Sequence, residues 1–189
     1  MLNVRQQKSR SPVVKRFVGV DISEKRGCAI AAIDESGVAV GADCCQSAPA
    51  AVVATIRGLA GNCDVVIGID APRQPLAMAR SWYWNPKGAG WRPRKPSERG
   101  WGRHCEVVIA SMGIANPQWT PLLSEAPEWM KLGFELFQAC GELGEVHEVF
   151  PTASYTQLDR GSGPSLQLTF AGFSGHPKDV LDEIGRAHV

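Results

Sequence analysis

Acidic residues close three separate apolar runs of this chain, and they are its strongest chemical signal. Asp70 ends the run DVVIGID, Asp21 ends FVGVD, and Glu148 lies near the end of VHEVFP. Short β-branched runs that stop at a turn or a proline predict strands buried on both faces of a parallel sheet. Open α/β sheets bind ligands at the carboxyl ends of such strands. The pattern therefore predicts three carboxylates at one edge of a sheet.

Carboxylates crowded in this way require a neutralising cation or a shared proton. We expect Asp21, Asp70 and Glu148 to be metal ligands, and oxygen ligands favour Mg²⁺ or Mn²⁺ over zinc. A zinc site on His104 and Cys105 is the less favoured alternative. The ordinary interpretation of each acid is structural, because Asp commonly turns the chain after a strand.

A fourth acid, Glu106, lies near the start of the predicted helix RHCEVVIASMG, residues 103–113. If that end faces the strand ends, Glu106 joins the catalytic cluster and Arg103 orients it at i, i+3. The helix macrodipole by itself also favours a glutamate in the first turn. The two interpretations stay open.

The segment 80–102 combines four of the six tryptophans with arginine, lysine, glycine and proline. It has no apolar periodicity, which predicts a long structured loop. Rings that stack bases and cations that hold phosphates would make it a platform for single-stranded nucleic acid. Equally, the rings could form a small cluster with arginines stacked on them. The predicted nucleic-acid-binding residues are Arg80, Trp82, Trp84, Trp91, Arg92, Arg94, Trp101 and Arg103.

The chain has 189 residues and is 44% hydrophobic, which is typical of one globular domain. A run of 18 apolar residues and the apolar core of a signal peptide are both missing, so no membrane partner is expected. The six cysteines form no CxxC pair, which favours reduced core thiols in the cytoplasm. The net charge of +1 hides a basic arm at residues 1–16, a basic segment at 80–103 and an acidic remainder.

The predicted elements place the motifs in a mixed α/β domain over residues 17–183, after a disordered arm at 1–16. In chain order they are strands at 17–21, 26–34 and 37–43, a helix at 49–59, a strand at 64–70, helices at 103–113 and 128–143, a strand at 145–151, a short helix at 152–158 and a final helix from 178. Ser47 as N-cap or Pro49 in the first turn starts the helix at 49–59. The last six residues, 184–189, resemble a translated sequencing adapter, so we expect a non-native tail there.

This order of elements, with acids on the first, fourth and fifth strands and on the last helix, resembles the ribonuclease H-like fold. The motifs FVGVD, IGIDAP, RHCE and EVFP resemble those of the predicted-nuclease family catalogued as domain of unknown function 429. The resemblance implies a five-stranded mixed sheet, three antiparallel strands followed by two parallel ones, with helices on both faces. It also implies Asp21, Asp70, Glu106, Glu148 and Asp182 as catalytic acids, with Asp179 as the less favoured alternative to Asp182. The helix at 49–59 carries no acid where ribonuclease H enzymes place a glutamate.

These features predict a nuclease that hydrolyses phosphodiester bonds by a two-metal carboxylate mechanism. A catalytically inactive nucleic-acid-binding module and a small-molecule phosphoesterase are the rival hypotheses. An actin-like or kinase-type phosphotransferase is disfavoured because the chain has no GxxxxGK[ST] loop.

Overall fold

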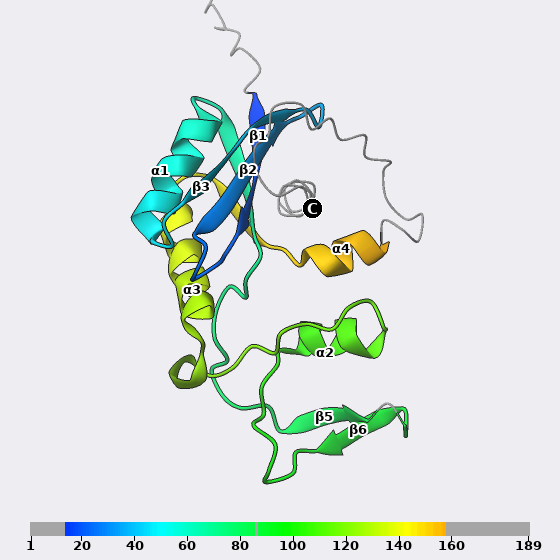
Figure 1. The fold of residues 1–189 in the computed structure, drawn as a ribbon. Helices are drawn as coiled ribbons and strands as arrows, with labels where there is room; N and C mark the ends of the chain where they lie inside the picture. The colour runs from blue at the N-terminus through cyan, green and yellow to red at the C-terminus, as the bar shows by residue number, and fades with distance from the viewer. Residues whose placement is uncertain (1–13, 86, 158–189) are drawn as a thin grey trace, which may run out of the picture.

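Strand β1 (Lys15–Asp21) lies in the middle of a five-stranded mixed sheet (Figure 1). The computed structural model describes residues 14–85 and 87–157. The other strands are β2 (Cys28–Asp34), β3 (Ala39–Cys45), β4 (Asp64–Ile69) and β7 (Glu145–Glu148), and the order across the sheet is β3-β2-β1-β4-β7. The pairs β1–β2 and β2–β3 are antiparallel, whereas β1–β4 and β4–β7 are parallel. The predicted mixed α/β architecture with five strands is confirmed.

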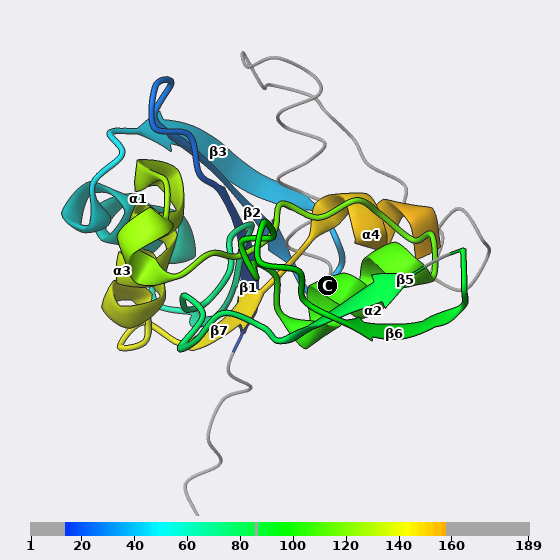
Figure 2. The ribbon, with the colours of Figure 1, turned by 90° about the horizontal axis from the view of Figure 1, so that it is seen from below.

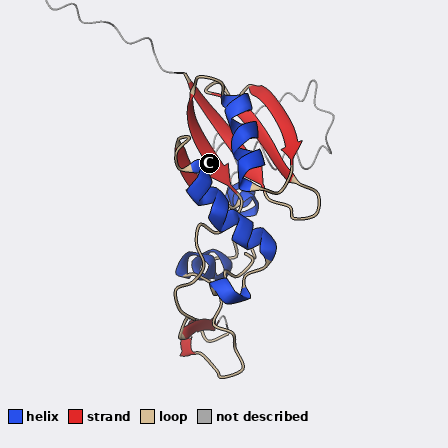
Figure 3. Cartoon of the chain, turned by 90° about the vertical axis from the view of Figure 1, so that its left-hand side faces the viewer, coloured by secondary structure: helices blue, strands red, loops and turns tan. Residues whose placement is uncertain are grey.

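Two helices, α1 (Pro49–Ala60) and α3 (Glu128–Cys140), pack against the same face of this sheet (Figure 3). Their apolar sides meet alternate strand residues in one core, which includes Val18, Val20, Ile56, Ile67 and Leu136. Helices were expected on both faces, and those that pack on the sheet within the described residues cover one. The final helix expected from residue 178 lies outside them.

The remaining elements extend beyond the carboxyl ends of the parallel strands (Figures 1 and 2). They are helix α2 (His104–Ser111), the 3₁₀ turn η1 (Leu123–Glu125), helix α4 (Pro151–Gln157) and a hairpin of β5 (Trp82–Asn85) and β6 (Gly90–Pro93). The segment 80–102 was expected to be an irregular loop, and the hairpin corrects that expectation. Its strands pair Trp84 with Trp91 across an antiparallel ladder.

Element boundaries differ from the predicted ones for local reasons. β1 begins at Lys15, so the last two residues of the arm expected to be disordered belong to the sheet. β2 begins only at Cys28, after Gly27, which has φ +85° and where a Cβ would lie 2.4 Å from the Cys45 carbonyl oxygen. Pro49 occupies the first turn of α1, whereas the Ser47 hydroxyl donates a hydrogen bond to the Ser23 carbonyl at 2.5 Å.

The cysteines are free thiols, but only Cys28 and Cys140 are buried. The expectation of core thiols is therefore correct for these two and wrong for the exposed Cys44 and Cys105. Burial raises the pKa of Cys140 to about 11, so this thiol stays protonated near neutral pH. Among the described helices, none is both long and apolar enough to cross a membrane.

Candidate functional site

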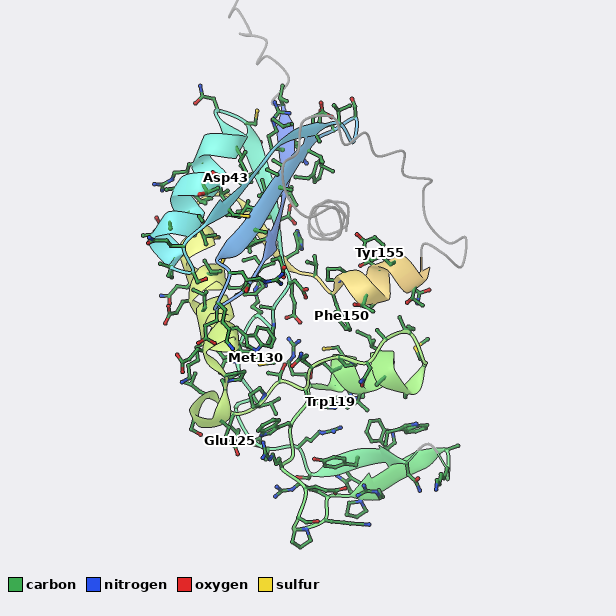
Figure 4. All side chains as sticks on the ribbon, viewed as in Figure 1. Asp43, Trp119, Glu125, Met130, Phe150 and Tyr155 are labelled. Atoms are coloured by element: carbon green, nitrogen blue, oxygen red, sulfur yellow. The ribbon has the colours of Figure 1, made fainter. Side chains whose placement is uncertain are left out.

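A cavity of about 720 Å³ opens where β1, β4 and β7 end, and α2 and the start of α4 form its far wall. Asp21, Asp70, Glu106 and Glu148 all line it. Figure 4 shows Phe150, another lining residue, where the chain leaves β7 for α4. The fifth predicted acid, Asp182, lies outside the described residues.

The two aspartates are neighbours in the strand register. Val20 pairs with Ile69 across the parallel strands, and the Asp70 N–H donates a hydrogen bond to the Val20 carbonyl at 3.0 Å. Val20 and Ile69 face the core beneath α1 and α3. Because strand side chains alternate, the following residues, Asp21 and Asp70, are directed to the opposite face together.

Glu148 reaches the cavity from the other side of the sheet. Glu148 pairs with Ile69, whose side chain faces the core. Because side chains alternate along a strand and paired residues share a face, the Glu148 side chain leaves β7 on the face that carries α3. Its carboxylate accepts hydrogen bonds from the Arg73 N–H at 2.9 Å and from Arg103 Nη1 at 2.6 Å, and a further one from Arg103 Nη2. The three acids therefore line one cavity without forming a joint ligand set. Among residues 14–85 and 87–157, no three His, Cys, Asp or Glu side chains are grouped closely enough to hold a metal ion.

Arg103 lies between two glutamates. Its Nε donates to Glu106 Oε1 at 2.8 Å, and its Nη2 lies 2.8 Å from the same oxygen. Nη2 is shared between the two glutamates, because it and Nη1 make a bidentate contact with Glu148. Burial alone would lower the pKa of Arg103, but the hydrogen bonds to Glu148 and the charges of both glutamates raise it overall. Arg103 is therefore a fixed positive charge in a cavity whose charged side chains are mostly acidic.

Glu106 is fully engaged inside the protein. The residue is 4% exposed, and Oε2 accepts from the backbone N–H groups of Arg103 and Thr120, each at 3.0 Å. Oε1 also accepts from the hydroxyl of Thr120, which is 0% exposed. The expected orientation of Glu106 by Arg103 at i, i+3 is confirmed, and the saturated carboxylate holds Arg103 in place.

The backbone before Arg103 is constrained by Gly102. This residue has φ +100°, and a Cβ there would lie 2.6 Å from Cε3 of Trp119. Its N–H donates to the Thr120 carbonyl at 2.8 Å. Figure 4 shows Trp119 between α2 and the hairpin. The loop that carries Thr120 and the turn before Arg103 are thus joined by a contact that only glycine permits.

Several predicted nucleic-acid-binding residues are engaged within the hairpin region. The Arg80 guanidinium lies 3.9 Å from the Tyr83 ring centroid and 5.2 Å from that of Trp119. Arg92 forms a bidentate pair with Glu98. Trp101 donates its indole N–H to Glu125 at 2.9 Å. Arginines also stack on the rings of Tyr83, Trp119 and Trp101, as the alternative of a small aromatic cluster expects.

A second group leaves rings open to solvent. Trp82 and Trp91 are 54% and 47% exposed, and the strand register puts Trp82, Trp84 and Trp91 on one face of the hairpin. Trp91 meets Trp84 edge-on at 5.5 Å and stacks on His104 at 5.8 Å. Arg94 is exposed and donates to the Glu98 carbonyl at 3.3 Å. His104, on which Trp91 stacks, lies in the sequence between Arg103 and Cys105, which both line the cavity.

The donor set fits one hard cation better than two. Mg²⁺ commonly uses one or two carboxylates and completes its shell with water and substrate oxygens, and Asp21 and Asp70 can supply that pair. Glu106 does not fit, because its oxygens already accept five contacts from Arg103 and Thr120. Glu148 becomes a ligand only if it leaves Arg103.

Sequence reasoning missed Thr120, Gly102 and the N–H of Arg73 as parts of the site. Thr120 lies in the segment NPQWTP, between the predicted helices at 103–113 and 128–143. Gly102 is one of four glycines in the segment 80–102, and nothing in its residue type distinguishes it. No family model, no curated protein and no solved structure matches the chain. The family resemblance therefore stays a prediction from the motifs.

Proposed function

We propose that this chain is a divalent-metal-dependent phosphodiesterase, and more finely a nuclease of ribonuclease H-like fold. The observation that carries the proposal is the pair Asp21 and Asp70, in register on neighbouring parallel strands and lining one cavity with Arg103. Two carboxylates can hold a hard cation, and a guanidinium can bind a phosphate through two hydrogen bonds. The strand and helix order from β1 to β4 and the IDAP and EVFP motifs support the same class.

In this mechanism Asp21 and Asp70 would hold one Mg²⁺ or Mn²⁺ ion. When bound, such an ion would supply an activated water and offset charge on the leaving oxygen. Arg103 binds a non-bridging phosphate oxygen, and its positive charge offsets the charge that develops there. Glu106 and Thr120 keep the guanidinium in a fixed plane. The two-metal form needs Glu148 as a further ligand, and therefore a rearrangement at Arg103.

Cleavage of labelled single-stranded RNA, single-stranded DNA, duplexes and hybrids tests this proposal, each with Mg²⁺, Mn²⁺ or EDTA. Asp70→Asn is the informative variant. Asp64→Asn is the matched control, because it removes the same charge from the other end of β4. We expect metal-dependent cleavage by the wild type and by Asp64→Asn, and none by Asp70→Asn. Equal cleavage by both variants, or none by the wild type, rejects the nuclease.

A catalytically inactive nucleic-acid-binding module is the second candidate. It is favoured by the engagement of Glu106 and Glu148 with Arg103 and by the exposed rings of Trp82 and Trp91. Fluorescence anisotropy in EDTA would then show binding to a labelled single strand without cleavage in Mg²⁺. Removing the Trp91 ring should weaken that binding by about 1–3 kcal/mol. Hydrolysis of a small phosphodiester alone would instead favour a small-molecule phosphoesterase.

A further inference from the structure

Three N–H donors converge on the carboxylate of Glu148. Arg103 Nη1 lies 2.6 Å and the Arg73 N–H 2.9 Å from Oε2, while Arg103 Nη2 donates to Oε1. A guanidinium fork of this kind matches a phosphate as well as it matches a carboxylate. The donors therefore form a binding site for an oxyanion, and a side chain of the protein occupies it.

Only one side of Arg103 is held firmly. Glu106 is 4% exposed and is fixed by the buried Thr120. The Glu148 side chain is 30% exposed, and its strand β7 has four residues and pairs with β4 alone in the described sheet. Within the described residues, every hydrogen bond to the Glu148 carboxylate comes from Arg103 or Arg73. Glu148 is thus the partner that can leave while the guanidinium stays in place.

The charge of the cavity favours exchange over simple addition of an anion. Five acidic and three basic side chains line it, namely Asp21, Glu24, Asp70, Glu106 and Glu148 against Lys25, Arg26 and Arg103. A phosphate that entered beside a bound Glu148 would meet this excess of negative charge at short range. A phosphate that replaces Glu148 on Arg103 takes over its three donors and lets the displaced carboxylate turn toward solvent.

We propose that Arg103 and the Arg73 N–H form a phosphoryl-binding site that Glu148 fills in the ligand-free protein and vacates when a phosphoryl group binds. The ligand is a phosphate, free or as a diester in a nucleic-acid strand. The displaced Glu148 then lies free at the cavity that Asp21 and Asp70 line, where it can complete a metal site. That last step rests on the proposed function, whereas the exchange does not.

Phosphate binding in EDTA tests the exchange without any metal. Isothermal titration compares inorganic phosphate and dimethyl phosphate on the wild type, Glu148→Gln and Glu145→Gln. We expect Glu148→Gln to bind at least one of the two about tenfold more tightly, which is the factor for one hydrogen bond to a charged group. Glu145→Gln removes the same charge from the start of β7 and should match the wild type. No gain in Glu148→Gln, or an equal gain in Glu145→Gln, overturns the proposal.

Inorganic phosphate and dimethyl phosphate distinguish the two possible ligands of the site, free phosphate and a phosphodiester. A gain for dimethyl phosphate assigns the site to a diester, and a gain for inorganic phosphate alone assigns it to free phosphate. Adding Arg103→Lys to Glu148→Gln should abolish the gain, since lysine keeps the charge but lacks the fork. Binding unchanged by that second substitution would place the phosphate elsewhere and overturn the assignment.

A measurement on the wild-type protein does not depend on whether any variant folds. The Arg103 side-chain Nε–H resonance should shift when phosphate saturates the protein, and an unmoved resonance overturns the proposal. Phosphate exchange without cleavage in Mg²⁺ would reject the hydrolase and leave this site intact. Metal-dependent cleavage without phosphate exchange would do the reverse.

Discussion

Two neighbours, Arg103 and Thr120, stabilise the buried charge of Glu106. Thr120→Val keeps the shape of the side chain and removes the hydroxyl that donates to Glu106. An acceptor left short of a partner in a buried site costs about 1–3 kcal/mol, so we expect that loss in the free energy of unfolding by urea. Thr152→Val, at an exposed threonine, is the control and should change stability by less than about 0.5 kcal/mol. Equal effects of the two substitutions would contradict this account of Glu106.

Single residues also show where the sequence was informative. The three-residue spacing of Arg103 and Glu106 predicted their contact, because helical neighbours at i, i+3 face each other. The contact of Arg103 with Glu148 spans 45 residues and depends on the register of β7. One residue of slip in that register would turn Glu148 to the other face, and the sequence does not specify the register. The sequence therefore predicted acids at the strand ends, but not the arginine that engages one of them.

At the scale of elements, Gly102 joins the hairpin region to α2. Gly102→Ala should destabilise the protein by more than about 1 kcal/mol, because alanine is strained at φ +100° and its Cβ would meet Trp119 at 2.6 Å. Gly113→Ala is the matched control, since it has φ +63° but nothing lies within 4 Å of the added Cβ. Urea unfolding should show the larger loss for Gly102→Ala. A loss no larger than that of the control would show that the contact with Trp119 carries no cost.

The hairpin itself was predicted as a loop for an identifiable reason. Trp82, Trp84 and Trp91 do alternate as strand residues should, but glycines and prolines surround them and mask the period. The ion pair between Arg92 and Glu98 also stabilises the segment by closing a turn. Secondary-structure propensities of single residues do not predict such a pair. Long, periodic elements such as α3 were predicted within a few residues, whereas this short element depends on side-chain pairing.

The same pair predicts an acid-sensitive hairpin. The hydrogen bond from Arg92, and then that from the Lys95 N–H, lowers the pKa of Glu98 from 4.5 to about 2. The pKa is lower in the folded protein, so the pair stabilises the hairpin above about pH 4.5 and is lost as the pH falls toward 2. Tryptophan fluorescence of the wild type should therefore change over this range relative to Glu98→Gln. Identical pH profiles would contradict the assignment.

Over the whole molecule, the sheet was the most predictable feature. All five predicted strands are present in it. β1, β2 and β4 contain buried apolar runs, whereas the edge strands β3 and β7 are largely exposed. The lateral order of the five strands put Asp21 and Asp70 side by side, as the strand endings implied. The sequence did not predict that the Glu148 side chain leaves β7 on the face of the sheet opposite to that of Asp21 and Asp70.

Stability in the presence of Mg²⁺ tests the assembled site. A ligand that binds only the folded protein stabilises it by about 2.7 kcal/mol at one hundred times its dissociation constant. We therefore expect the Tm of the wild type to rise with Mg²⁺, and the rise to disappear in Asp21→Asn and Asp70→Asn. Asp64→Asn, at the far end of β4, should keep it. Calorimetry that shows the same Mg²⁺ response in all four proteins would mean that the ion binds elsewhere, and the two aspartates would then be structural residues of the strand ends.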